Sequence, residues 1–297
     1  MEKFRRSMLF MPGNNPGMLQ DAAVLGADSI ILDLEDAVSL TEKDSARILV
    51  REAIKTIDYS QVEVVVRVNP LDTEFGPHDV EVIARVKPDA LLIPKATEDQ
   101  IQLVDKMLDQ IERDEGYEAG SIKLIALIET ALGLETIYNV IKASKRVVGV
   151  LLGGEDLTAD LGIKRTKEGE EIFYARNKVA IACRALKVDS IDTPFTDTLD
   201  DEGLAKDTAK AKSLGLTGKS AINPRQIEII HSVFAPTDAE LKHALRVLEA
   251  MSEAEKEGKG VCSLDGKMID APIINRATST VDQGIRLGLL IGEGGAR

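Results

Sequence analysis

The chain has 297 residues, of which 44% are hydrophobic and 29% charged, which is the balance of a globular protein long enough to bury a large core. Its net charge of −13 argues against non-specific binding to nucleic acid or to an anionic membrane, because attraction to phosphate groups needs a positive field. The sequence has no apolar run of about 20 residues that would span a membrane, and its two cysteines do not make a disulfide framework, so we expect a cytoplasmic protein.

Short apolar runs alternate with helical patterns from residue 7 to about residue 235. Apolar runs that stop at a polar residue or at proline are typical of strands buried on both faces of a parallel sheet. The predicted strands cover residues 7–11, 28–34, 62–68, 90–93, 124–128, 147–154, 188–192 and 216–222. The predicted helices cover residues 17–25, 41–54, 75–86, 97–115, 130–145, 170–186 and 200–213, and another begins at Pro224.

A polar residue stands at the carboxyl end of seven of these strands, and consecutive members lie about 30 residues apart, the length of one βα unit. These residues are Asp33, Arg67, Lys95, Glu129, Asp156, Asp192 and Lys219. Eight such units predict a (β/α)₈ TIM barrel over residues 1–235, which would be the catalytic domain with its active site at the carboxyl ends of the strands. A doubly wound sheet is the alternative.

The pattern changes after residue 235. Residues 237–257 predict a long charged helix with one apolar face, and Gly258 and Gly260 break it. A strand and turn follow at residues 264–269, and Asp270 opens a last helix. We therefore predict that residues 236–297 form a helical extension that covers the active site of its own or of a neighbouring subunit.

Glu129 and Asp156 follow two successive predicted strands and have small residues beside them. A single acid at such a position could simply begin a helix, because acids favour the first turn through the helix dipole. Two acids at the same edge of a parallel sheet can instead converge on one hard cation, and oxygen ligands that leave room for water and substrate suit Mg²⁺. The sequence thus predicts a Mg²⁺ site at Glu129 and Asp156.

Two basic residues stand at neighbouring strand ends and allow two interpretations each. Arg67 could bind a substrate carboxylate through two parallel hydrogen bonds, or it could form a structural salt bridge with Asp33 or Asp36. Lys95 could form a Schiff base only in an apolar pocket, whereas the acids predicted around the mouth favour a charged ammonium.

Six short motifs occur in order over nearly the whole chain, and with them the chain resembles the citrate lyase β-subunit family, within the wider HpcH/HpaI aldolase-like family of acyl-thioester carbon–carbon lyases. The motifs lie at residues 5–13, 32–38, 67–69, 128–130, 153–157 and 221–224. The resemblance implies Mg²⁺-dependent cleavage of a citryl thioester, carried on acyl carrier protein or coenzyme A, to oxaloacetate and an acetyl thioester. It also implies citrate lyase α and γ subunits as partners and a homotrimer or hexamer.

The resemblance assigns roles to individual residues as well. Mg²⁺ would lie on Glu129 and Asp156, and Arg67 would hold the oxoacid carboxylate. The thioester carrier would lie near the first loop and the basic strand ends, which are Arg5 or Arg6, Lys95 and Lys219 here. Asp270 matches an aspartate that related lyases bring into a neighbouring subunit's site, and it is the candidate acid/base. One departure is Asn223, where many members of the family have His before the proline.

Other functions remain open at this point. Relatives that cleave malyl or citramalyl thioesters share most of these motifs, and a thioesterase could use the same metal site. The barrel could also be a non-catalytic subunit that docks the carrier, although such a subunit would have no use for Glu129, Asp156 and Arg67 together.

Overall fold

The computed structural model describes residues 4–256 and 262–290. Residue contacts divide the chain into two compact units, Met1–Phe234 and Ala235–Arg297, and each is described by itself. Among the helices of the described residues, none is long and apolar enough to cross a membrane.

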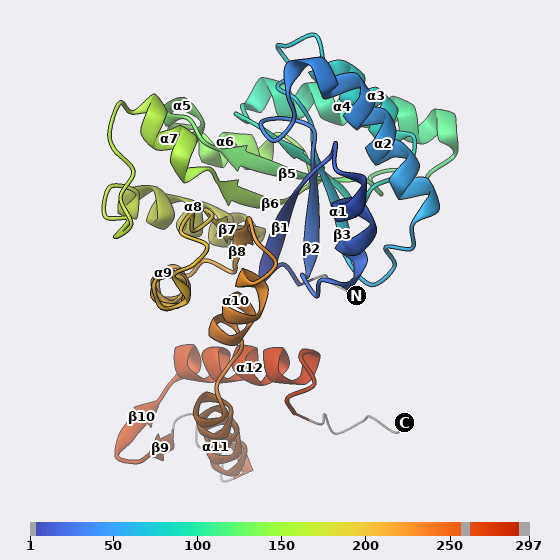
Figure 1. The fold of residues 1–297 in the computed structure, drawn as a ribbon. Helices are drawn as coiled ribbons and strands as arrows, with labels where there is room; N and C mark the ends of the chain where they lie inside the picture. Colours follow the sequence, from blue (N-terminus) through green and yellow to red (C-terminus); the bar gives the residue numbers. More distant parts are fainter. Residues whose placement is uncertain (1–3, 257–261, 291–297) are drawn as a thin grey trace. The chain divides into compact units, whose positions relative to one another are not determined.

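The first unit is a closed barrel of parallel strands, in which each strand pairs with the next and β8 pairs with β1 (Figure 1). The strands are β1 (Ser7–Pro12), β2 (Ser29–Asp33), β3 (Glu63–Arg67), β4 (Ala90–Ile93), β5 (Lys123–Ile128), β6 (Val147–Leu152), β7 (Asp189–Asp192) and β8 (Gly218–Ala221). The predicted (β/α)₈ barrel is therefore confirmed. Its register sets Pro12 beside Asp33 and Asp33 beside Arg67, so the carboxyl ends of the strands meet at one mouth.

Helices follow the strands and lie outside the barrel (Figure 1). They are α1 (Pro16–Asp21), η1 (Ala22–Val24), η2 (Leu40–Glu42), α2 (Lys43–Thr56), α3 (Gly76–Ala84), α4 (Glu98–Glu115), α5 (Ala131–Glu135), α6 (Ile137–Lys142), α7 (Gly154–Asp160), α8 (Phe173–Leu186), α9 (Asp201–Ser213) and α10 (Gln226–Phe234). The prediction of one helix over residues 130–145 is wrong, because Thr136 leaves helical geometry at φ −100° and ψ 11° and separates α5 from α6. The short α7 is not among the helices that the sequence predicts.

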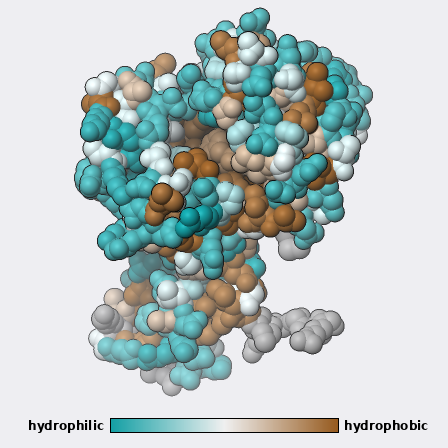
Figure 2. Space-filling view, viewed as in Figure 1, coloured by the Kyte–Doolittle hydropathy of each residue, from teal (hydrophilic) through white to brown (hydrophobic). Residues whose placement is uncertain are grey.

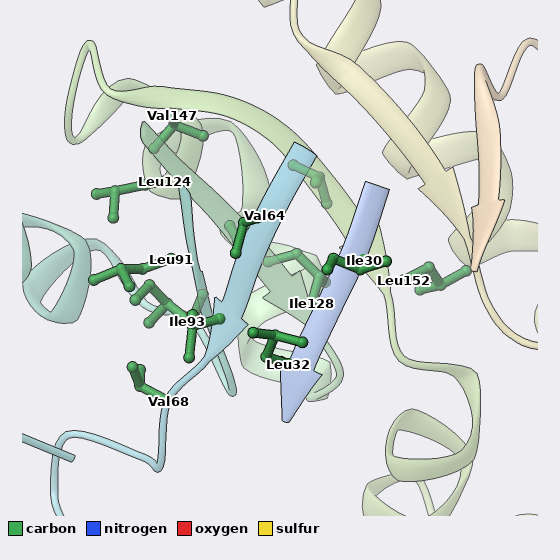
Figure 3. Close-up of a cluster of buried hydrophobic side chains, with 14 of the residues drawn as sticks. Ile30, Leu32, Val64, Val68, Leu91, Ile93, Leu124, Ile128, Val147 and Leu152 are labelled. Atoms are coloured by element: carbon green, nitrogen blue, oxygen red, sulfur yellow. The ribbon is translucent and has the colours of Figure 1, made fainter. Parts of the chain in front are cut away.

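Strand side chains alternate between two buried clusters, as the period of a β-strand requires. One cluster fills the barrel interior and includes Met8, Ile31, Val65, Ile125 and Leu127. The other lies between the strands and the helices, where Ile30, Leu32, Val64, Leu91, Ile93 and Ile128 pack (Figure 3). The same alternation turns residue 67 and residue 129 to the inside of the barrel, next to its mouth. Figure 2 shows one face of this unit, which is mostly hydrophilic and is hollowed near its middle, where hydrophobic residues gather.

The second unit contains α11 (Asp238–Lys256), a hairpin of β9 (Cys262–Leu264) and β10 (Lys267–Ile269), and α12 (Ala271–Arg286). It has a small core of its own, formed by Ala244, Val247, Ile269 and Ala277. The helix break predicted at Gly258 and Gly260 lies outside the described residues. Asp270 is the N-cap of α12, and its side chain accepts a hydrogen bond from the Ile273 N–H at 3.2 Å.

A buried charge cluster joins the end of α4 to the start of β6. Arg146 donates to both carboxylate oxygens of Glu112 at 2.7 Å, and it also donates to Asp105, to Asp109 and to the Ile122 carbonyl oxygen. Glu112 also accepts the backbone N–H groups of Gly120 and Ile122. Burial by itself would raise the pKa of Glu112, but the hydrogen bonds from Arg146 and from the backbone outweigh it and lower that pKa to about 2.

We expect Glu112→Gln to lower the free energy of unfolding by about 3 kcal/mol at neutral pH, because it leaves Arg146 with incomplete charge compensation in a buried site. A carboxyl group whose pKa is lowered by folding stabilises the protein above its unfolded pKa, and this stabilisation is lost as the pH falls towards the folded value of about 2. Urea unfolding at several pH values should therefore show the two proteins converging in acid.

The matched control for this change is Glu115→Gln, in the same helix. Glu115 forms an ion pair with the exposed Arg85 at 2.6 Å, and such surface pairs contribute about 1 kcal/mol or less. Equal destabilisation by the two substitutions would show that the Arg146 cluster has no special role.

Candidate active site

Glu129 follows β5 and is held between the loops after β4 and β6. It is 2% exposed, and one of its carboxylate oxygens accepts the Lys95 N–H at 2.8 Å. On the other side lies Gly153, where a Cβ atom would come within 2.6 Å of the Glu129 Cβ and 2.8 Å of its Oε2. Only glycine fits there, so the sequence of the β6 loop fixes where the Glu129 carboxylate lies.

Asp156 lies in the first turn of α7, which begins directly after β6, and its side chain is exposed. Its negative charge acts on Glu129. Burial is the largest cause that raises the pKa of Glu129, to about 8, and the charges of Glu35 and Asp156 add to the effect. The Lys95 N–H and the charge of Arg67 act in the opposite direction. The structure therefore brings Glu129, Asp156, Arg67 and Lys95 into one electrostatic neighbourhood.

Arg67 pairs with the acidic residues at the end of β2. Its Nε and Nη2 donate to the two carboxylate oxygens of Asp33 at 2.7 and 2.6 Å, and its Nη1 lies 2.9 Å from Glu35. The guanidinium also lies over the ring of Phe10 at 5.0 Å. The salt bridge between Arg67 and Asp33, one of the two interpretations of Arg67 from the sequence, is therefore present. The pair of parallel hydrogen bonds that the other interpretation assigned to a substrate carboxylate is made to Asp33 instead. The Nη1 group faces Glu35 and Asp36, the latter at 3.5 Å, rather than Asp33.

Glu35 is a candidate site residue that the sequence reasoning did not single out. It is 4% exposed, and its Oε2 has no hydrogen-bond partner although it lies within ion-pair distance of Arg67. Burial raises the pKa of Glu35 to about 7, against the lowering effect of Arg67. The available signal was the cluster Asp33, Glu35 and Asp36 at one strand end, which places more negative charge there than a structural salt bridge needs.

The mouth has the character of a site for a hard divalent cation. Its donors are carboxylate oxygens, and two buried carboxyl groups, Glu35 and Glu129, have raised pKa values that a nearby cation would lower. Within residues 4–256 and 262–290, no group of three or more His, Cys, Asp or Glu side chains forms a ready-made metal cage. A site with two carboxylate ligands, completed by water and substrate, suits Mg²⁺.

Lys95 lies at this mouth and is exposed, with its backbone in the left-handed region at φ 47°. That conformation directs its N–H to Glu129 and leaves the ammonium in solvent. Lys95 is therefore not enclosed in the apolar pocket that a Schiff-base lysine would need. Its contact with the carrier stays a prediction.

The prediction that Arg5 lies beside the thioester carrier at the mouth of the barrel is wrong. Arg5 precedes β1 and bonds to Glu63 and Asp189, the first residues of β3 and β7, at 2.6 to 2.8 Å. In a parallel barrel these amino ends lie opposite the mouth, so Arg5 closes the far end of the barrel.

The prediction that Lys219 binds the carrier is also wrong. Lys219 is 0% exposed, and its ammonium donates to Asp192, to Asp207 and to the carbonyl oxygen of Thr193. Because Asp207 belongs to α9, the side chain points outward from the barrel wall, where no substrate can reach it.

Two further residues have local roles in the structure. Asn223 accepts the Arg225 N–H at 3.0 Å through its side chain, which makes it a turn residue before α10. Asp270 caps α12 in the second unit, and its proposed role as acid/base stays a prediction.

Known proteins are similar to this chain in sequence and in fold. A profile of the HpcH/HpaI aldolase/citrate lyase family matches residues 6–224. The chain is 46% identical over 282 residues to citrate lyase subunit beta of Haemophilus influenzae, covering 95% of this chain and 97% of that protein. It is 35% identical over 277 residues to (3S)-malyl-CoA thioesterase of Cereibacter sphaeroides, covering 93% of each.

A solved structure with a similar fold is that of protein CitE from Mycobacterium tuberculosis in complex with magnesium, acetoacetate and coenzyme A. Its TM-score is 0.78 at 28% sequence identity, and the match covers 94% of this chain and 97% of that one.

The contact between Gly153 and Glu129 can be tested by substitution. We expect Gly153→Ala to lower the free energy of unfolding by about 1–3 kcal/mol, because the added methyl group must displace Glu129 or the β6 loop. Gly149→Ala in β6 is the matched control: its Cβ would meet nothing nearer than 3.5 Å, so we expect a change within about 0.5 kcal/mol. If thermal unfolding shows equal losses, Gly153 does not fix the position of Glu129.

Proposed function

The chain belongs to the HpcH/HpaI aldolase/citrate lyase family, and from that membership we propose that it is a Mg²⁺-dependent carbon–carbon lyase. The proposed reaction cleaves a citryl thioester, carried on acyl carrier protein or coenzyme A, to oxaloacetate and an acetyl thioester. The observation that supports it most is that Glu129, Asp156 and Arg67 share one mouth, which supplies metal ligands and a carboxylate contact side by side.

Glu129 and Asp156 would hold the metal, and Glu35 adds negative charge beside them. When bound, Mg²⁺ acts as a Lewis acid that lowers the pKa of a substrate hydroxyl and stabilises developing charge on oxygen. The related M. tuberculosis protein was crystallised in complex with magnesium, acetoacetate and coenzyme A, and these three ligands match the metal, keto acid and thioester carrier of the proposed reaction.

Arg67 would orient the oxoacid. Asp33 holds the Nε and Nη2 edge and so fixes the plane of the guanidinium, while Phe10 lies against its face. The Nη1 group, now beside Glu35 and Asp36, would receive a substrate carboxylate. Burial alone would lower the pKa of Arg67, but Asp33 and Glu35 raise it above its ordinary value, so the group stays charged.

Asp270 is the proposed acid/base, because Glu129 and Asp156 are assigned as ligands. Its carboxylate would take the proton of the tertiary hydroxyl as the C–O bond becomes a carbonyl. The adjacent carbon–carbon bond breaks, and its electron pair passes to the acetyl thioester as an enolate. Return of the proton to the enolate carbon completes the acetyl thioester and restores the carboxylate.

Two aspects of assembly belong to the same proposal. Citrate lyase α and γ subunits would supply the thioester carrier and exchange the acyl group, in keeping with the similarity to a citrate lyase subunit beta. The chain would form a homotrimer or hexamer, in which residues 236–297 of one subunit bring Asp270 to the barrel of a neighbour.

A thioesterase is the second candidate, because the chain is also 35% identical to a (3S)-malyl-CoA thioesterase. The products distinguish the two functions. Purified protein should be incubated with citryl-CoA, malyl-CoA and citramalyl-CoA in the presence of Mg²⁺. A lyase yields a keto acid and a thioester, whereas a thioesterase yields the hydroxy acid and free thiol.

The metal ligands give the next prediction. We expect Glu129→Gln and Asp156→Asn to lower the cleavage rate by about 100-fold or more, since each removes a charged ligand from a site that stabilises the transition state. Calorimetry should show weakened Mg²⁺ binding by both variants. Glu155→Gln is the control, because Glu155 is an exposed acid in the same turn that forms a 3.6 Å ion pair with Arg165. A variant at 129 or 156 with normal rate and Mg²⁺ affinity would refute the assignment.

The contribution of Asp270 in trans can be tested with mixed oligomers. Asp270→Asn and Arg67→Ala subunits should each be inactive alone. If each site combines Arg67 of one chain with Asp270 of the next, equal mixing should restore about a quarter of the wild-type activity, because about a quarter of the interfaces join two intact residues. No recovery in verified mixed oligomers would place Asp270 in its own barrel or outside the mechanism.

A further inference from the structure

The two glycines that follow β6 are enclosed on both sides by side chains. Gly153 lies against Glu129, and Gly154 lies against Thr193, the first residue after β7. The Gly154 N–H donates to the Thr193 hydroxyl at 3.0 Å, and a Cβ atom at residue 154 would lie 2.8 Å from that hydroxyl oxygen. The start of α7 is therefore held between one proposed metal ligand and Thr193.

Thr193 is itself fixed from the outside of the barrel. It is 0% exposed, and its carbonyl oxygen accepts a hydrogen bond from the Lys219 ammonium at 2.7 Å. Lys219 belongs to a buried ion quartet, formed by Arg176, Asp192, Asp207 and Lys219. The four ion-pair distances in this quartet lie between 2.6 and 2.8 Å.

The ion quartet joins α8, β7, α9 and β8 with two positive and two negative side chains, all of them buried. Burial alone would raise the pKa of Asp207, but Lys219 and Arg176 lower it, so the carboxylate is charged. Displacing any member leaves an uncompensated charge in the interior, which makes the arrangement stiff. The quartet is out of reach of any substrate, and the group that it holds towards the mouth is Thr193.

The position of Asp156 depends on the hydrogen bond between Gly154 and Thr193. Its carboxylate has no hydrogen bond or ion pair within the described residues, so it is the backbone of α7 that determines where the side chain starts relative to Glu129. Asp156 is two residues after Gly154, in the same helical turn. Any shift of the Gly154 N–H therefore moves the carboxylate relative to Glu129.

We propose that Thr193 is a positioning residue for the metal ligand Asp156, acting through its hydrogen bond to the Gly154 N–H and anchored by the buried ion quartet. This inference rests on the proposed function, since it takes Asp156 as a Mg²⁺ ligand. Outer-shell partners of metal ligands commonly change affinity by about 10- to 100-fold when they are removed. Thr193 would act one step further out, through the backbone of the helix that carries the ligand.

The test is the Mg²⁺ dissociation constant, measured by calorimetry on the full chain. Thr193→Val keeps the shape of the side chain and removes the acceptor, and we expect it to weaken Mg²⁺ binding about 10-fold. Thr193→Ser restores the hydroxyl and should bind within about 2-fold of the parent. Thr208→Val is the matched control, because Thr208 is equally buried but bonds only to the Leu204 carbonyl of its own helix.

The reference is Asp156→Asn, which separates this inference from the proposed function. If Asp156→Asn loses Mg²⁺ and Thr193→Val keeps the parent affinity, the positioning role is refuted and the metal site stands. Equal weakening in the Val and Ser variants would also refute it, because the hydroxyl would then not matter. If Asp156→Asn binds Mg²⁺ normally, both assignments fail. Should Thr193→Val not fold, Thr193→Ala removes the same hydrogen bond without adding a methyl group beside Gly154.

Discussion

Buried ionised side chains in this barrel are repeatedly paired with opposite charges, because an unpaired charge in the interior is strongly destabilising. Arg5 pairs with Glu63 and Asp189 at the amino ends of the strands. On the outer wall, the positive and negative side chains of the buried ion quartet pair with one another. At the carboxyl ends the pairing is incomplete. Arg67 is shared among several acids, and burial raises the pKa of Glu129 to about 8. The surplus of carboxyl groups at this one end distinguishes the site from the structural charge clusters.

The repeated spacing of polar residues was sufficient to predict the barrel and its mouth, because a parallel βα unit has a nearly constant length. It also placed Glu129 and Asp156 correctly at neighbouring strand ends, where the carboxyl edge of a parallel sheet brings side chains together. Helix boundaries were harder to predict from the sequence. The break between α5 and α6 at Thr136 depends on local packing, and the short α7 has too few residues for a helical period to be seen.

The predictions that Arg5 and Lys219 bind the carrier failed for different physical reasons. Arg5 stands before the first strand, so its position relative to the barrel axis was readable from the predicted topology, although the resemblance favoured a role at the mouth. Lys219 stands on a strand whose apolar pattern is too weak to show which side chains face inward. A change of one residue in strand phase moves a side chain from the interior to the outer wall, and only the three-dimensional structure decided between them.

The two proposed metal ligands lie in opposite surroundings. Glu129 is buried, so its ionisation is costly until a positive charge arrives, whereas Asp156 is exposed and is solvated beforehand. A glycine contact lies next to each of them: Gly153 lies against Glu129, and Gly154, two residues before Asp156, lies against Thr193. A cation bound between them would offset the cost of ionising the buried Glu129, and the exposed Asp156 would keep contact with water.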